Sequence, residues 1–281
     1  MIMTMHNKLV YDNSTLCHIC NDEHGQDRVR DHCHLPGKFR GAAHDFCNLK
    51  YKVPTFFLGV FHNLSGYDSH LFINNWDISE GDISCIPNNE VNNITFTKQV
   101  IVNKFVYKEG TQINVKHELS FIDSLKFMAS ILDKLSSILK IDQFVNLQKY
   151  YSGNQLSLLF RKGVYPYDYV DCMTKLDETS LPPKEAFYSK LTGEGITDEV
   201  YQHAHTVWKE FNIESMKNYH NLYNLSDVLL LADIFEDFRS ICMNHYGFDP
   251  AWYYSALGLA WDASLKITKV QLDLLTIPTC C

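Results

Sequence analysis

The sequence of 281 residues lacks a long apolar segment. No apolar run reaches the roughly 18 residues that a membrane-spanning helix needs, and the N-terminus lacks the charged-then-apolar pattern of a secretory signal peptide. We therefore expect an intracellular protein of a reducing compartment that has no membrane partner. Its nine cysteines are better explained as metal ligands and isolated thiols than as a disulfide framework.

The sequence also lacks an excess of positive charge. It has 25 Lys and Arg residues and 33 Asp and Glu residues, which gives a formal net charge of −8. A protein that coats nucleic acid without specificity would be basic overall, so this class is disfavoured. An enzyme that acts on nucleic acid is not excluded, because its carboxylates can hold metal ions while a local groove binds phosphates.

No internal repeat and no low-complexity tract divides the chain, so its organisation follows from local patterns. The first 53 residues are rich in Cys and His and have little apolar periodicity. Later residues alternate between strand-like and helix-like patterns, as in an α/β domain. We predict a small module over 1–53, an α/β domain over 54–246 and a helical region over 247–281.

Several elements can be predicted from periodicity. The apolar run PTFFLGVF (54–61) predicts a buried strand, and the alternation over 92–123 predicts a hairpin with its turn at 109–111. Apolar residues at steps of three and four predict a helix over 124–140. Further helices are expected from Thr197 and over Ser215 to His245. The buried face of the last helix is expected from one apolar stripe: Val228, Leu231, Phe235, Phe238 and Ile241.

Two tightly spaced ligand pairs dominate the first module. Cys17 and Cys20 form one pair, and His44 and Cys47 form the other, with 23 residues between them. Each pair can bind one side of a tetrahedral zinc ion. A segment this short cannot bury a core of its own, so a structural Zn2+ explains how it folds. The alternative is a set of scattered thiols and surface histidines.

The residues between and beside these pairs can support hydrolytic chemistry. Asp31 and Asn48 offer oxygen ligands to a hard cation such as Mg2+, and His32 can act as a general base toward water. Lys38 and Arg40 flank a turn and can bind phosphate groups.

The order Cys-x2-Cys, Asp-His-x-His, Gly-Lys-x-Arg-Gly and a ligand pair followed by Asn resembles the recombination endonuclease VII family of His-Me finger (HNH-type) nucleases. The resemblance covers roughly Cys17 to Asn48 and implies a structural zinc ion, a catalytic metal at Asp31 and Asn48, and His32 as the general base. His44 stands where the family usually has a cysteine, and Cys33 lies between the two histidines. An active nuclease and a DNA-contacting remnant without cleavage both remain open.

A second constellation joins two distant segments. In YHNLYNLSDVLLLADIFEDFR, Tyr223 and Asp227 are four residues apart and share one helix face. In FHNLSGYDSHLF, Asn63 and Asp68 follow the predicted strand. Carboxylates at such positions can hold two Mg2+ ions about 4 Å apart for phosphodiester hydrolysis, with a tyrosine hydroxyl orienting the water. By itself the helix pair also fits an ordinary polar edge.

Together the two segments resemble the second and third exonuclease motifs of family B DNA polymerases, in particular the protein-primed type of viruses and Maverick/Polinton mobile elements. The blocks FIDSLKFM, RKGVYPYDYV, LPPKEAFYSKL and GLAWDASLKIT extend the resemblance over residues 15–275. It implies that an incomplete ribonuclease H-like exonuclease domain follows the zinc-stabilised His-Me finger-like module in the sequence. It also implies DNA and a terminal priming protein as partners.

The same resemblance implies residue roles and a missing part. It makes Asp68 and Asp227 metal carboxylates, Tyr223 the residue that positions water, Asn63 a contact to the single-stranded 3′ end and Lys126 a neighbour of the scissile phosphate. The Asp-x-Glu pair of the first exonuclease motif and the polymerase carboxylates are absent from the sequence. We therefore expect a fragment without polymerase activity and with weak exonuclease activity at most, in a nuclear, viral or mobile-element setting.

Overall fold

The computed structural model describes residues 3–33, 37–51, 55–64, 81–87, 93–106, 112–270 and 272. Contacts divide the chain into two compact units, Met1–Gly59 with Ser65–Ile122 and Val60–Leu64 with Asp123–Cys281. The domain boundaries expected at residues 53 and 246 are not tested by this division and stay predictions. Each unit is described by itself below.

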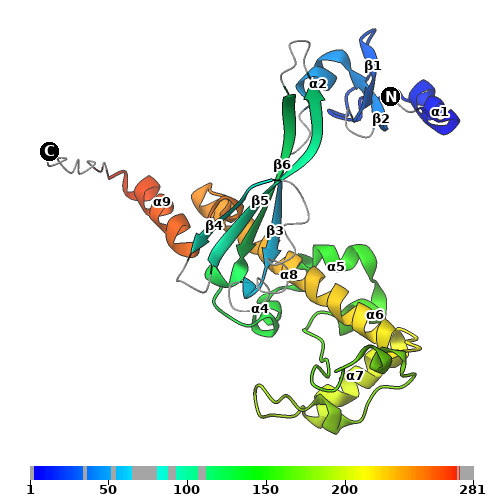
Figure 1. The fold of residues 1–281 in the computed structure, drawn as a ribbon, viewed down its shortest axis with the longest axis vertical. Coiled ribbons are helices and arrows are strands. Elements are labelled where there is room, and N and C mark those ends of the chain that lie inside the picture. Colours follow the sequence, from blue (N-terminus) through cyan, green and yellow to red (C-terminus); the bar gives the residue numbers. More distant parts are fainter. Residues whose placement is uncertain are drawn as a thin grey trace. The chain divides into compact units, whose positions relative to one another are not determined.

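The N-terminal part of the first unit consists of short elements (Figure 1). These are helix α1 (Met5–Asn13), strands β1 (Arg28–His32) and β2 (Phe39–His44), and helix α2 (Asp45–Lys50). The strands pair antiparallel, and a register shift follows Asp31. We call the described residues of this part, 3–33 and 37–51, the Cys/His module.

The second part of the first unit is a sheet with the strand order β3-β6-β5-β4. Its strands are β3 (Phe56–Phe61), β4 (Ile83–Pro87), β5 (Asn93–Val106) and β6 (Gln112–Asp123). The antiparallel pairing of β5 with β6 confirms the predicted hairpin. β3 confirms the predicted strand, but its expected burial is wrong, because Phe57 is exposed and its other residues are half-buried. The expected turn at 109–111 lies outside the described residues.

The helix expected over 124–140 is wrong in its first half. A 3-10 turn occupies Ser124–Lys126, and helix α4 covers only Leu132–Ile138. The buried carboxylate of Asp123 accepts a hydrogen bond from the Leu125 N–H and caps this turn. Phe127 then packs against Phe235 and Phe238 and does not continue a helical stripe.

Helices make up most of the second unit, which we call the helical unit. After α4 come α5 (Val145–Tyr150), α6 (Gly153–Leu158), α7 (Asp198–Glu210), α8 (Met216–Tyr246) and α9 (Ala256–Thr268). The side chains of Thr197 and Ser215 cap α7 and α8, as their positions in the sequence predict. Gly247 ends α8 with a positive φ of 68°.

The core of the helical unit lies along α8. One cluster of buried side chains brings α4, α5 and α6 against it: Leu132, Phe144, Leu147, Leu159, Leu229, Leu230 and Ile234. The second gathers the N-terminal half of α8 with α7 and the loop after α6: Tyr165, Val207, Ile213, Met216, Tyr219 and Tyr223. The expected apolar stripe was partly wrong, because Val228 and Ile241 are exposed while Leu229 and Leu230 are buried.

The fold is therefore α/β, with a four-stranded sheet, a set of helices and a Cys/His cluster. Among the described residues, no helix is both long and apolar enough to cross a membrane.

Candidate functional sites

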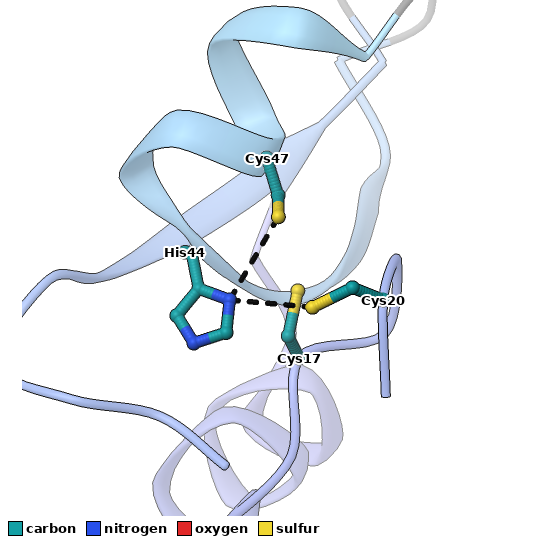
Figure 2. A group of neighbouring side chains, drawn as sticks. All are labelled: Cys17, Cys20, His44 and Cys47. Carbon is teal, nitrogen blue, oxygen red and sulfur yellow. Dashed lines mark hydrogen bonds between the residues drawn. The ribbon is translucent and has the colours of Figure 1, made fainter. Parts of the chain in front are cut away.

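The four predicted zinc ligands of the Cys/His module come together. The ligand atoms of Cys17, Cys20, His44 and Cys47 all lie within 4.8 Å of one another. Figure 2 shows the sulfurs of Cys20 and Cys47 directed at His44 Nδ1, at 3.4 Å and 3.8 Å. Cys17 and Cys20 lie on a turn that the hydrogen bond from Asn21 N–H to the Cys17 carbonyl closes. His44 and Cys47 come from the end of β2 and from α2.

The imidazole of His44 is oriented as a metal ligand. Its Nε2 lies 3.0 Å from the carbonyl oxygen of Glu23, which can only accept a hydrogen bond. The proton is therefore on Nε2, and the lone pair of Nδ1 points at the sulfurs. A hydrogen bond from the remote ring nitrogen to a carbonyl is the usual support of a metal-binding histidine.

The thiols resist carrying several negative charges without a cation. Burial would raise the pKa of Cys17, but backbone N–H groups, first that of Cys20, outweigh it and lower that pKa to about 6. At Cys20 the backbone N–H of Asp22 favours the thiolate, yet desolvation and the neighbouring sulfurs raise its pKa to about 11. A metal ion would stabilise all of these thiolates together.

The donor set and geometry therefore fit a metal ion. The cluster could hold one, and it is compatible with structural zinc, which prefers four tetrahedral sulfur and nitrogen ligands. The rest of the module offers little else to fold around. Besides Cys17, its buried apolar residues among those described are Phe39, Ala42 and Ala43.

Next to the cluster, Asp31 forms a buried charge network. Its carboxylate accepts hydrogen bonds from Arg40 Nε at 2.8 Å and Arg40 Nη2, and it lies 2.9 Å from His18 Nε2. Burial acts to raise the pKa of Asp31, but these partners outweigh it, so the pKa lies below its usual range. The Arg40 guanidinium also stacks on the Tyr51 ring, 4.3 Å from its centre.

This network bears on the predicted Mg2+ site. Asp31 lies at the end of β1 next to His32, which is half-buried, and Asn48 lies half-buried on α2. Because Arg40 and His18 engage both oxygens of Asp31, a cation there would have to replace one of them. Arg40 thus binds the carboxylate of Asp31, and its expected contact with phosphate stays a prediction. Lys38 is exposed, and His34 lies outside the described residues.

A second site lies on α8 in the helical unit. Tyr223 and Asp227 occupy one face of the helix, as their spacing predicts. The Tyr223 side chain is buried, and its hydroxyl lies 2.6 Å from the hydroxyl of Tyr167. Its ring stacks on Tyr165, with the ring centres 5.1 Å apart. Burial and the nearby Asp227 raise the pKa of Tyr223 above its usual range, so it stays a neutral hydroxyl.

Asp227 is a largely buried carboxylate with one unsatisfied oxygen. Lys162 Nζ lies 3.5 Å from Oδ2, while Oδ1 is buried and has no hydrogen-bond partner among the described residues. Burial raises the pKa of Asp227, and Lys162 and Tyr223 oppose this only in part. Buried polar atoms are normally paired, so Oδ1 is an acceptor that no described residue satisfies.

The segment that follows β3 is held by the start of the 3-10 turn. The Asn63 N–H donates to Asp123 Oδ1 at 2.8 Å, and Asn63 itself has a positive φ of 73°. His62 lies 2.9 Å from both the Ser124 hydroxyl and the Ser130 carbonyl oxygen. Asp123 thus both caps the 3-10 turn and binds the backbone of Asn63. Asp68 lies outside the described residues, and Lys126 is half-buried within the 3-10 turn.

Sequence patterns missed the partners of Tyr223 and Asp227. Lys162 and Tyr167 belong to the loop that follows α6, more than fifty residues before Asp227, so no local spacing connects them. Gly163 is a further case: a Cβ atom there would lie 3.1 Å from Tyr223 Cδ2. The only available sequence signal was the block RKGVYPYDYV, which contains all three.

In comparisons with known proteins, no family model, curated protein or solved structure matches this chain.

Proposed function

We propose that the chain is the exonuclease region of a protein-primed-type family B DNA polymerase, preceded by a His-Me finger-like module with a structural Zn2+. The observation that carries the proposal is the environment of Asp227. It combines a buried oxygen that lacks a partner among the described residues, a neighbouring ammonium group and a tyrosine hydroxyl. Groups of these kinds can take part in the hydrolysis of a phosphodiester with Mg2+.

Each side chain has a definite part in such a reaction. Asp227 would bind Mg2+ through Oδ1, and the bound ion supplies a Lewis acid that activates water. Tyr167 holds the Tyr223 hydroxyl in place, so that this hydroxyl can orient the attacking water. Lys162 lies beside Oδ2, where its charge can bind a phosphate oxygen of the DNA. Gly163 allows the backbone of this loop to pass against the Tyr223 ring.

Other assignments in the proposal follow the sequence motifs. Asp68 would supply a second metal carboxylate, Asn63 would contact the single-stranded 3′ end, and Lys126 would lie near the scissile phosphate. The Asn63 N–H is hydrogen-bonded to the Asp123 carboxylate, which fixes the backbone at Asn63. A fixed backbone suits a contact to DNA that needs a defined direction. The parent activity would be DNA synthesis with 3′–5′ proofreading, started from a terminal priming protein.

The proposal is tested by degradation of single-stranded DNA. An oligonucleotide labelled at its 5′ end is incubated with excess chain and Mg2+ or Mn2+, and the products are resolved at single-nucleotide resolution. We expect slow, stepwise shortening from the 3′ end. Asp227→Asn should abolish it, and Tyr223→Phe should lower the rate by about 100-fold, the lower end of the range that a positioned catalytic group contributes.

The matched control is His32→Ala, which leaves the α8 site unchanged. Shortening that survives Asp227→Asn would refute the assignment. Template-directed incorporation of nucleotides by this chain would contradict the expectation that it lacks polymerase activity.

A second candidate function rests on the Cys/His module. Strands β1 and β2 and helix α2 follow one another and contact one another, with Asp31 and His32 at the end of β1 and Asn48 on α2. This arrangement suits a Mg2+-dependent DNA endonuclease. Internal cuts in branched or duplex DNA, abolished by His32→Ala and unchanged by Asp227→Asn, would favour it. DNA binding with one zinc ion per chain and no cleavage would instead favour a noncatalytic DNA-binding module.

A further inference from the structure

The four ligands of the Cys/His cluster differ in their access to solvent. Cys17 is completely buried, Cys47 is half-buried and Cys20 is exposed. The sulfur of Cys17 faces backbone N–H groups of its own turn and of His44. The sulfur of Cys20 points at His44 Nδ1, 3.4 Å away, although Cys20 as a residue is exposed (Figure 2). Among the three cysteines of the cluster, Cys20 is therefore the most exposed residue and Cys17 the least.

Exposure matters because the thiolate form of cysteine is the reactive one. A bound zinc ion keeps its sulfur ligands deprotonated, and among thiolates the accessible one is oxidised or alkylated first. Loss of one ligand from a four-coordinate site weakens the others, and this module has few other buried residues to hold its shape.

We propose that Cys20 is a peroxide-sensitive modification site through which oxidation releases zinc and unfolds the Cys/His module. The inference rests on the structural zinc of the proposed function, and it is independent of any activity on DNA. The reagent is a peroxide of the class of hydrogen peroxide.

The chemistry is a two-electron oxidation of two thiolates. The Cys20 sulfur attacks one peroxide oxygen, so an S–O bond forms, the O–O bond breaks and hydroxide leaves. The Cys17 sulfur, within 4.8 Å in the same cluster, then attacks the Cys20 sulfur. An S–S bond forms, the S–O bond breaks and a second hydroxide leaves, both hydroxides taking protons from solvent. The zinc ion, left with His44 and Cys47 alone, dissociates.

The wild-type chain tests the first step directly. The zinc-loaded protein is treated with limiting N-ethylmaleimide or hydrogen peroxide, and each cysteine is quantified by peptide mass spectrometry. We expect Cys20 to react at least about tenfold faster than Cys17 and Cys47, because reactivity follows accessibility among thiolates. Modification of Cys17 or Cys47 first would overturn the proposal.

Variants test the release of zinc. Cys20→His keeps a ligand that zinc accepts but removes the thiol, and Cys85→Ser changes an exposed cysteine outside the cluster. With a chromogenic chelator, we expect peroxide to release zinc from wild type and Cys85→Ser alike, and at least about tenfold more slowly from Cys20→His. Equal rates in all three would overturn the proposal. If Cys20→His fails to bind zinc, the wild-type labelling order decides alone. Absence of zinc from the wild-type chain would refute the zinc site itself.

Discussion

The Cys/His module and the helical unit fix their candidate sites by different means. In the module, Asp31 and the four metal ligands are positioned by charge and by a metal-binding geometry, with few buried apolar side chains around them. In the helical unit, Tyr223 and Asp227 sit on a 31-residue helix that two apolar clusters surround. One site depends on what it binds, while the other is built before it binds anything.

This difference predicts how each region responds to change. A site held by ligands is destabilised strongly when the ion or a charge partner is removed, because few buried side chains hold the backbone. A site on a packed helix tolerates loss of its own polar groups, and it fails when the apolar contacts beneath it are weakened. The same difference explains why oxidation is a plausible control of the module and not of α8.

Removal of zinc should have the largest effect. Structural zinc in small domains contributes on the order of 10 kcal/mol to folding, so a strong chelator should unfold the module. Hydrogen exchange should then show complete loss of amide protection across β1 and β2, while α8 keeps its protection. Addition of zinc should restore the first pattern. Retained protection in β1 without zinc would show that the Asp31 network alone holds the module.

More of the Cys/His site than of the α8 site could be predicted from the sequence. The reason is that sequence patterns connect only residues that are close together in the chain. The four candidate metal ligands could be predicted because each pair is local and has the spacing typical of zinc sites. The shared face of Tyr223 and Asp227 followed from the helical repeat. Lys162 and Tyr167 could not be predicted as their partners, because a loop brings them to α8 from a distant part of the chain.

The errors have equally local causes. The helix over 124–140 was expected from its apolar steps, but a 3-10 turn capped by Asp123 occupies its start. The contact of Arg40 with Asp31 was not foreseen, since neither charge nor spacing showed that Asp31 would fold against it. On α8, Val228 was placed in the core although packing buries Leu229 and Leu230. Tertiary contacts decided each case.

The second prediction concerns the charge network of the module. Arg40→Ala leaves the buried Asp31 with His18 alone, and loss of one member of a buried ion pair costs about 3–5 kcal/mol. Lys38→Ala, a nearby exposed cation, should have little effect. Amide hydrogen exchange of β1 in zinc-loaded wild type, Arg40→Ala and Lys38→Ala measures the effects of both substitutions. Equal protection in wild type and Arg40→Ala would show that zinc alone determines the stability of the module.

The pH dependence of the Arg40→Ala variant shows in which direction Arg40 shifts the pKa of Asp31. In wild type the pKa of Asp31 is lowered, so the pair stabilises the fold above the ordinary carboxyl pKa and this contribution is lost only as pH falls through the lowered value. Without Arg40, the burial that opposes ionisation is less compensated, so the pKa of Asp31 should rise. Carboxyl-carbon NMR should show Asp31 ionised throughout the range in which wild type holds zinc, and titrating at higher pH in Arg40→Ala.

The smallest predicted effect concerns the helical unit. Leu230 is fully buried in the core cluster along α8, so Leu230→Ala should destabilise the helical unit by about 2–5 kcal/mol. Leu225, on the same helix, is 40% exposed, and Leu225→Ala should change stability by no more than about 0.5 kcal/mol. Urea unfolding followed by circular dichroism measures both, and zinc content should stay the same. If Leu230→Ala also released zinc, the two regions would not be independent, and the contrast between a ligand-held and a packed site would fail.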